Sequence, residues 1–338
     1  MRVLVTGGTG KVGRAAVARL VAHGHLVRVI GRGAGHTIPG AEYQVCDIRD
    51  YGALRAAMRG MEGVVHLAAI PHPSMGTGIE IFDANCGGSY RVYEAAAAEG
   101  IRRVVSASSI NAFGYNFSVG DPLLNYFPVD EAHPTATSDA YSFSKQVLEE
   151  IAAYYWRREG ISGICLRLPY VYEVIPPAEG WDDAYVVGIR RNVAELLALP
   201  AAELAARVDG ILAMDRVERA ERHAERPRGA GPRPAAPFAD YTAMVGRSNF
   251  WTSIDSRDSA QAIEKGLLAE YAGSHPLFVN DRVNCVGVPS RQLVEVFFPE
   301  IRHWQRRVEG AETLVSIDRA RELIGYEPEY SLDTESAG

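Results

Sequence analysis

The sequence predicts an α/β protein, built as a doubly wound parallel sheet with a small C-terminal cap. Short β-branched runs alternate with longer helical patterns through the first half of the chain, which is typical of a parallel sheet covered by helices. A glycine-rich turn follows the first apolar run and opens the first helical pattern. The chain has 338 residues, which is enough for one large domain with an appendage.

The predicted elements follow each other in a regular order. We expect strands at 3–5, 26–30, 64–67, 104–107 and 164–168, and amphipathic helices at 12–23, 51–59, 79–99 and 141–159. After Tyr172 this order breaks into a helical region at 187–223 and a proline-rich loop at 226–234. The segments 251–270 and 277–280 look like a return to the main sheet. We expect the main domain to cover 1–169, with 250–281 returning to it, and the cap to cover 170–249 and 282–338.

Composition excludes several classes of protein. The net charge is −7, which argues against nucleic acid as a partner, because that binding needs clustered Lys and Arg. No apolar run is long enough to cross a membrane, and no signal peptide precedes the first strand. The four cysteines show neither disulfide nor metal-ligand spacing. We therefore expect a cytoplasmic protein without membrane contact and without a metal site.

The glycine-rich turn predicts a dinucleotide site. Glycine permits a tight turn and a close approach of the backbone to a pyrophosphate, and the start of the following helix offers free N–H groups. A strand before the turn and a helix after it make the motif specific. This sheet is therefore of the Rossmann type, and the expected contacts are Gly7, Gly10, Lys11, Val12 and Gly13.

Two later positions bear on which nicotinamide cofactor binds. At the end of the second strand, Arg32 stands near the place where an NAD-specific fold usually has an acid. An arginine can pair with a 2′-phosphate, so NADP(H) is preferred, with NAD(H) as the alternative. Asp47, followed by Ile48, stands where the third strand ends and could accept a hydrogen bond from the adenine amino group. Asp47 could instead cap the following helix, and Arg32 could simply be solvated.

Tyr141 and Lys145 lie four residues apart on a predicted helix. Residues at this spacing share a helix face, so the ammonium can sit beside the phenol and favour its ionised form. Such a phenol becomes usable as a proton carrier near neutral pH. The pair alone carries little information, but it occurs together with the glycine turn and with Ser109.

Taken together, these motifs resemble the extended short-chain dehydrogenase/reductase family, in its NAD-dependent epimerase/dehydratase branch. The likeness runs from Met1 to about Tyr330. It is carried by the glycine turn, the segments 66–69, 85–96 and 108–114, the Tyr141 to Lys145 pair, and the segment 166–169.

The resemblance implies a role for each site residue. Tyr141 is the general acid/base, Lys145 lowers the pKa of that phenol and binds the nicotinamide ribose, and Ser109 hydrogen-bonds the reacting oxygen. Asn85 joins through a water. Ser109 is preferred over Ser108 because it stands five residues before Gly114. The further cofactor contacts that we expect are Leu67, Ala68, Ala69 and Pro169. The family likeness also implies a homodimer.

Departures from the family pattern narrow the reaction. Tyr170 and Trp251 stand where nucleotide-sugar enzymes carry an Asn and an Arg that contact the substrate diphosphate. Ile110 and Asn111 replace the acidic pair of the sugar dehydratases. We expect an NAD(P)-dependent oxidoreductase that acts on a carbonyl or secondary alcohol of a small polar or sugar-like molecule. The alternative is a nucleotide-sugar epimerase with tightly bound cofactor, and a non-catalytic NADP-sensing binding protein is less favoured.

The walls of the substrate site are expected from one loop and from the cap. The candidates are His72, Ser109, Asn111, Tyr115, Tyr170 and Trp181. Each has a simpler interpretation: a loop histidine is often only exposed, and tryptophans at a cap junction often pack in the core. The helical stretch at 187–223 could close over the site as a lid or pack on a second subunit.

Overall fold

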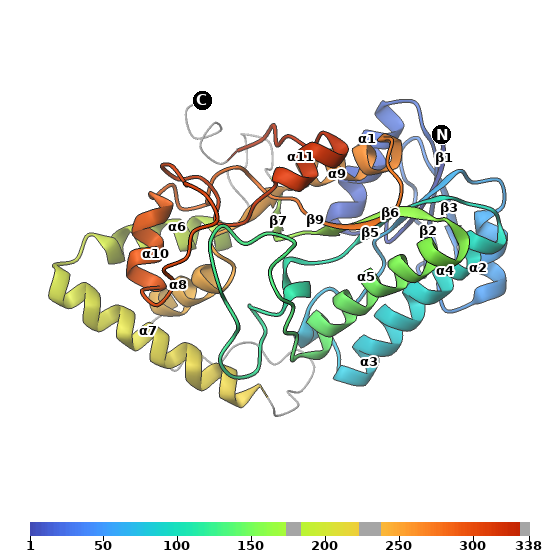
Figure 1. The fold of residues 1–338 in the computed structure, drawn as a ribbon. Helices are drawn as coiled ribbons and strands as arrows, with labels where there is room; N and C mark the ends of the chain where they lie inside the picture. Colours follow the sequence, from blue (N-terminus) through green and yellow to red (C-terminus); the bar gives the residue numbers. More distant parts are fainter. Residues whose placement is uncertain (174–183, 223–237, 332–338) are drawn as a thin grey trace.

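The computed structural model describes residues 1–173, 184–222 and 238–331 (Figure 1). In this part of the chain, seven parallel strands form one sheet in the order β3-β2-β1-β4-β5-β6-β9. The doubly wound parallel sheet predicted from the sequence is confirmed. The strands are β1 (Arg2–Thr6), β2 (Leu26–Gly31), β3 (Glu42–Val45), β4 (Gly63–His66), β5 (Arg103–Ala107), β6 (Ser162–Arg167) and β9 (Ser274–Phe278).

The apolar strands are buried on both faces of the sheet. Val3 and Val5 pack into the core under one layer of helices, whereas Leu4 packs into the core under the other, because successive side chains of a strand point to opposite faces. The first layer holds α1 (Lys11–Ala22), α9 (Ser256–Leu268) and α11 (Asp318–Ile324). The second holds α2 (Tyr51–Met58), α4 (Gly88–Ala98) and α5 (Ala140–Glu159) (Figure 1).

The helix predicted at 79–99 is interrupted. A capping box at Thr77 starts α3 (Gly78–Phe82), a π-helical turn covers Asp83–Gly87, and α4 follows directly. Helix α5 begins where the carboxylate of Asp139 accepts from the N–H of Ser142, and it ends at Gly160 with φ of 67°. These caps satisfy backbone groups that a helix end leaves free.

The cap is built around a second core. Strands β7 (Tyr170–Tyr172) and β8 (Ser253–Asp255) pair in a separate small sheet. The helical region predicted at 187–223 is two helices, and Pro200 stands directly before the second. The proline-rich stretch at 226–234 lies outside the described residues. The cap helices are α6 (Ala184–Leu197), α7 (Ala201–Glu221), α8 (Phe238–Ser248) and α10 (Ser290–Phe297).

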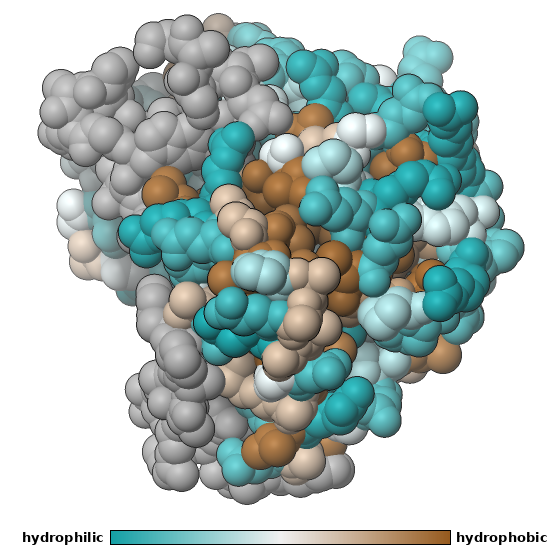
Figure 2. Space-filling view, turned by 90° about the vertical axis from the view of Figure 1, so that its left-hand side faces the viewer, coloured by the Kyte–Doolittle hydropathy of each residue, from teal (hydrophilic) through white to brown (hydrophobic). Residues whose placement is uncertain are grey.

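Seen from the cap side, hydrophobic residues gather in the middle of the face between polar ones (Figure 2). The exposed large hydrophobic side chains of the cap helices include Val187 on α6 and Val217 on α7. Among the described helices, none is long and apolar enough to span a lipid bilayer.

Candidate active site

The glycine turn packs tightly against the end of β4. Gly7 has φ of +71°, and a Cβ there would lie 2.8 Å from the backbone nitrogen of Ala68. A Cβ on Gly13 would lie 2.3 Å from the carbonyl oxygen of Gly7, whereas one on Gly10 would meet nothing closer than 3.5 Å. Gly10 also precedes α1 without a side-chain cap. The turn therefore presents bare backbone at a helix N-terminus, which fits the pyrophosphate of a dinucleotide.

The end of β4 is held to the end of β1 by one hydroxyl. Thr6 Oγ1 accepts from the N–H groups of Leu67 and Ala68, each at 3.1 Å. The next residue, Ala69, lines a small pocket together with Lys145. The three residues predicted from the resemblance thus lie between the glycine turn and Lys145.

Lys11 and Val12 begin helix α1 and point to different surroundings. Val12 packs against the core of the sheet. Lys11 Nζ donates to the carbonyl oxygen of Val171 at 2.9 Å and lies 5.4 Å from the centre of the Tyr170 ring. Tyr170, expected on the substrate side, is therefore beside the first turn of α1.

At the edge of β2 and β3, two arginines surround Asp47. Arg49 binds the Asp47 carboxylate at 2.6 Å, and this pairing, helped by the charge of Arg32, lowers the pKa of Asp47. Arg32 is exposed. Ile48 packs where α4 begins, since a Cβ on Gly88 would lie 2.7 Å from Ile48 Cδ1. The sequence prediction missed Arg49, although its spacing of two residues from Asp47 permits the pair.

The structure brings Ser109, Tyr141 and Lys145 together. Ser109 follows β5 and accepts from the N–H of Asn111 at 3.1 Å, and its hydroxyl lies close enough to the Tyr141 phenol to act on the pKa of that phenol. Lys145 Nζ donates to the carbonyl oxygen of Ala107 at 2.7 Å and lies 5.8 Å from the centre of the Tyr141 ring. A hydroxyl, a phenol and an ammonium therefore meet at the carboxyl end of β5.

Burial dominates the electrostatics of Tyr141 and Lys145. Burial raises the pKa of Tyr141 to about 12; the charge of Asp139 adds to this and the hydrogen bond with Ser109 opposes it. Burial also lowers the pKa of Lys145 to about 8. Desolvation of the charged form is thus the largest influence on both groups. The expectation that Lys145 lowers the pKa of the phenol stays a prediction.

Ser108 has a different environment from Ser109. Its hydroxyl donates to Glu149 Oε1 at 2.7 Å, and Glu149 is also bound by Arg167 at 2.8 Å. This buried group supports the end of β6. Pro169, a predicted cofactor contact, is buried two residues after the end of that strand.

Asn85 lies in the π-helical turn and anchors the loop that follows β4. Its Oδ1 accepts from the N–H of Ile70 at 2.7 Å, and its Nδ2 donates to Ile70 O at 3.1 Å and to Ser144 Oγ at 3.0 Å. Asn85 and Lys145 line the same small pocket. The volume of this pocket, about 10 Å³, is close to that of one water. A single water between Asn85 and Lys145 is compatible with this geometry.

A buried chain of hydrogen bonds behind the site was not predicted. Ser89 donates to the carbonyl oxygen of Asn85, so it must accept from His66 Nε2, which lies 3.0 Å away. His66 Nδ1 then accepts from Thr6 Oγ1 at 2.9 Å. Burial, with the charge of Lys145, lowers the pKa of His66 to about 3. His66 is therefore neutral with its proton on Nε2. It connects the end of β1 to the π-helical turn that contains Asn85.

The residues predicted as substrate walls separate into different locations. His72 is exposed, and its ring centre lies 5.1 Å from that of Phe117, which lies 5.9 Å from that of Tyr141. Asn111 is 7% exposed and contacts Ser109 through its backbone. Trp181 lies outside the described residues.

Tyr115 does not fit its predicted place on the substrate wall. Its side chain is 2% exposed and packs in the cap core, with its ring centre 4.7 Å from that of Phe250. Trp251, which stands at a position of the family's phosphate-binding Arg, is 1% exposed in the same core. Both aromatic side chains therefore stabilise the cap.

Comparisons with known proteins agree with this architecture. The model of the NAD dependent epimerase/dehydratase family matches residues 3–180. The L-arabinose 1-dehydrogenase (NAD(P)(+)) of Haloferax volcanii is 31% identical over 188 residues, which cover 54% of this chain and 72% of that protein.

A uronate dehydrogenase of Pseudomonas syringae pv. tomato is 29% identical over 171 residues, which cover 49% of this chain and 58% of that protein. The chain thus matches somewhat more than half the length of this relative. Among solved structures, a UDP-glucose 4-epimerase with UDP-glucose from Thermotoga maritima superposes with a TM-score of 0.62. Its sequence is 17% identical, and the match covers 98% of this chain and 95% of that one.

Proposed function

Because this chain belongs to the NAD dependent epimerase/dehydratase family, we propose that it is an oxidoreductase with Tyr141 as its acid/base. It transfers hydride between a nicotinamide cofactor and a carbonyl or secondary alcohol of a small polar or sugar-like substrate. The observation that carries this proposal is the meeting of Ser109, Tyr141 and Lys145 beside the glycine turn. The activities of the relatives, which include a sugar and a uronate dehydrogenase, agree with it.

Each residue has a distinct task in this proposal. The bound nicotinamide would supply or accept the hydride. Ser109 donates to the reacting oxygen and Tyr141 gives or takes the proton on that oxygen. Lys145 is protonated below a pH of about 8, and its charge would stabilise the phenolate that proton transfer leaves. A water at Asn85 would return the proton.

We propose NADP(H) as the preferred cofactor, with NAD(H) as the alternative. Arg32 is exposed and follows β2 directly, near the place where an NAD-specific fold usually has an acid. Arg49 adds a second guanidinium at the same edge, although it is paired with Asp47. An exposed guanidinium suits a 2′-phosphate better than a ribose hydroxyl.

A nucleotide-sugar epimerase is the alternative activity. The positions of Tyr170 and Trp251 argue against it, because Tyr170 lies beside Lys11 and Trp251 is buried in the cap. Neither can replace the diphosphate contacts that the family pattern places there. The two activities differ in a simple measurement: an epimerase keeps its cofactor and shows no net consumption of NADPH, whereas the proposed enzyme exchanges and consumes it.

The Tyr141→Phe variant tests the proposed function against a binding protein without catalysis. The variant should bind NADPH as the wild type does, because the lost hydroxyl does not contact the glycine turn. Turnover with a panel of sugars and carbonyl compounds should fall about 10²- to 10⁴-fold, which is the usual contribution of a general acid/base. Unchanged turnover would refute the role of Tyr141.

We also propose a homodimer that forms through α4 and α5, in the cytoplasm. Exposed aromatic side chains lie on these helices, among them Tyr90, Phe143, Tyr154 and Trp156, and aromatic residues are enriched at interfaces. The four cysteines are free and buried, which suits a reducing compartment. Light scattering gives the mass directly, and a Tyr90→Glu and Trp156→Glu double variant should be monomeric.

A further inference from the structure

The segment 115–118 lies next to the candidate site and belongs to no helix or strand. Tyr115, Asn116 and Ser118 are buried, whereas Phe117 between them is half-buried. Buried carbonyl groups outside regular structure need hydrogen-bond donors from elsewhere. Here the donors come from a helix more than a hundred positions further along the chain.

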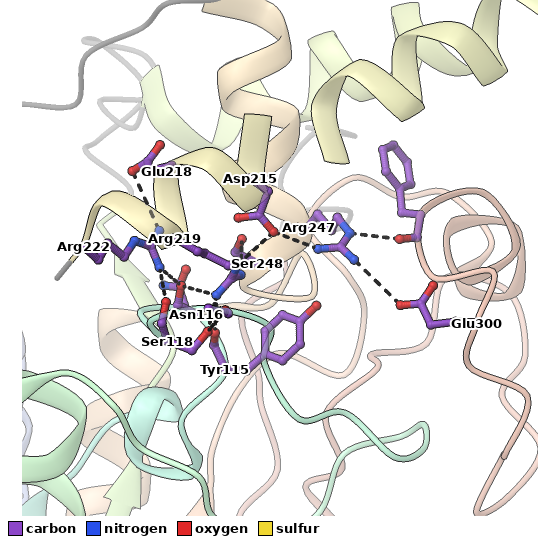
Figure 3. Close-up of polar contacts among 12 residues, drawn as sticks. Tyr115, Asn116, Ser118, Asp215, Glu218, Arg219, Arg222, Arg247, Ser248 and Glu300 are labelled. Carbon is purple, nitrogen blue, oxygen red and sulfur yellow. Dashed lines mark hydrogen bonds and ion pairs between the residues drawn. The ribbon is translucent and has the colours of Figure 1, made fainter. Parts of the chain in front are cut away.

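Arg219 of helix α7 supplies part of these donors (Figure 3). Its side chain is 1% exposed. One of its terminal nitrogens donates to the carbonyl oxygens of Tyr115 at 2.8 Å and Asn116 at 3.3 Å, and to the hydroxyl of Ser118. A guanidinium has five N–H groups in a rigid fork, so it can hold several acceptors in fixed positions.

Arg222, one turn further along, holds the same segment. Its NH1 donates to the carbonyl oxygen of Asn116 at 2.7 Å and to that of Ser118 at 3.2 Å. Glu218 lies 3.8 Å from its other terminal nitrogen. The carbonyls on both sides of Phe117 are therefore bound by α7.

The remaining partners of Arg219 fix the helix itself. Asp215 accepts from Arg219 at 2.9 Å and from Arg247 of α8 at 3.2 Å (Figure 3). Arg247 also donates to the carbonyl oxygen of Phe297, at the end of α10. A buried carboxylate between two guanidiniums thus locks α7 to its neighbours.

Phe117 is the residue that this arrangement turns toward the site. Its ring meets that of Tyr141 edge-on, with ring centres 5.9 Å apart and planes at 77°. The same ring also meets the His72 ring, with ring centres 5.1 Å apart and planes at 85°. Phe117 therefore contacts both the proposed proton carrier and the loop that follows β4.

His72 offers a hydrogen-bond donor beside this ring. Its Nδ1 accepts from the backbone N–H of Ser74 at 3.1 Å. Although the residue as a whole is exposed, partial desolvation of its ring, with the charge of Arg222, lowers the pKa of His72, so the ring is neutral at pH 7 and carries its proton on Nε2. An apolar ring and an N–H donor thus stand together near Tyr141.

We propose that Phe117 is a substrate-binding residue whose ring takes the C–H face of a single sugar ring, and that Arg219 and Arg222 position it. His72 Nε2–H would donate to a hydroxyl of the same sugar. This inference rests on the proposed function, because it assigns the substrate side of the same site. It gives helix α7 a task in substrate recognition, although α7 lies outside the nucleotide-binding sheet.

The first test compares KM values for ring-shaped and open-chain probes. The probes are L-arabinose and D-glucuronate on one side and glyceraldehyde on the other. Phe117→Ala should raise KM for the ring-shaped sugars about tenfold, because contact with the apolar face is lost. The KM for glyceraldehyde should stay within about twofold. Phe117→Tyr keeps the ring and should restore the wild-type values.

The arginines are tested by exchange for lysine, which keeps the charge but loses the fork. Arg219→Lys and, at the less buried position, Arg222→Lys should raise the same KM values as Phe117→Ala. Arg216→Lys is the matched control, because Arg216 is exposed on the same helix. A KM that rises equally for all three probes, or for none, would overturn the positioning role.

A second readout does not depend on turnover. Absorbance differences between each protein and its own Tyr141→Phe version isolate the ionisation of Tyr141. The pKa of this phenol is about 12, raised mainly by burial; Ser109, Asp139 and Lys145 lie close to it, and His72 contacts Phe117. Phe117→Ala admits water, so at pH 11 about half of the phenol should be ionised, against about a tenth in the wild type.

The two readouts separate this inference from the proposed function. If no probe is turned over but Phe117→Ala changes the titration, the hydride-transfer proposal fails, whereas the packing of the Phe117 ring on Tyr141 stands. If turnover is normal, and Phe117→Ala alters neither KM nor the titration, the role of Phe117 is refuted. Circular dichroism at pH 11 confirms that each protein compared is folded.

Discussion

Lys145 donates to the carbonyl oxygen of Ala107 at 2.7 Å, while its Nζ lies 5.8 Å from the centre of the Tyr141 ring. The ammonium is thereby tied to the end of β5 and not to the phenol. In this state burial governs both groups: it raises the pKa of Tyr141 to about 12 and lowers that of Lys145 to about 8. In the protein without cofactor, burial thus favours the neutral form of both side chains.

The burial of Lys145 predicts a pH dependence of stability. The unfolded chain keeps this proton up to a pH near 10.5, and the folded protein only up to about 8. Between these values the unfolded state binds more protons, so the free energy of unfolding rises with pH. Relative to Lys145→Met, the wild type without cofactor should gain about 3 kcal/mol over this range.

Urea denaturation at pH 7.5, 9 and 10.5 measures this difference. Lys265→Met, on helix α9, is the control and should follow the wild type. Equal slopes for the wild type and Lys145→Met would show that Lys145 is not desolvated in the folded protein.

The close packing of Gly13 predicts that an alanine there destabilises the protein, whereas helix propensity alone predicts that it stabilises. Gly13→Ala puts a Cβ 2.3 Å from the carbonyl oxygen of Gly7, so the turn must shift, at a cost of about 1–3 kcal/mol in the free energy of unfolding. Binding of NADPH should weaken with it. Gly210→Ala is the matched control on α7, where a Cβ meets nothing within 4 Å, and it should stabilise by up to about 1 kcal/mol. Calorimetry measures the stability of both variants. A Gly13→Ala variant as stable as the wild type would contradict the close packing at this position.

The cofactor preference depends on Arg32. Arg32→Gln should weaken NADPH binding about 10- to 100-fold, because a charged hydrogen bond is lost. Binding of NADH should change little, and Arg59→Gln, another exposed arginine, should change neither. Fluorescence titrations measure all six affinities. Tighter binding of NADH than of NADPH by the wild type would contradict the proposed preference for NADP(H).

Much of the fold is predictable because its residues are locally consistent. The alternation of Val3, Leu4 and Val5 between two cores needs apolar residues at every position, and such runs between helical patterns identify a parallel sheet. The glycine turn and the Tyr141 to Lys145 spacing are likewise local patterns.

Other features depend on contacts that no local pattern reveals. The π-helical turn at Asp83–Gly87 lets Asn85 bind both backbone groups of Ile70, and helical periodicity alone predicts an uninterrupted helix there. Aromatic residues are used equally in cores and in binding sites, so the sequence could not separate buried Tyr115 from half-buried Phe117. Arg219 and Arg222 of α7 bind carbonyl groups about a hundred residues away in the sequence. Only the tertiary structure brings these segments together.

Deuterium transfer tests hydride transfer at Tyr141 most directly. NADPH in which both hydrogens at C4 of the nicotinamide are replaced by deuterium is incubated with the protein and each carbonyl compound of the panel, and the alcohol is examined by mass spectrometry. The account predicts one deuterium on the carbinol carbon with the wild type, and loss of nearly all labelled product with Tyr141→Phe. Product without deuterium, or equal labelling by the variant, would contradict it.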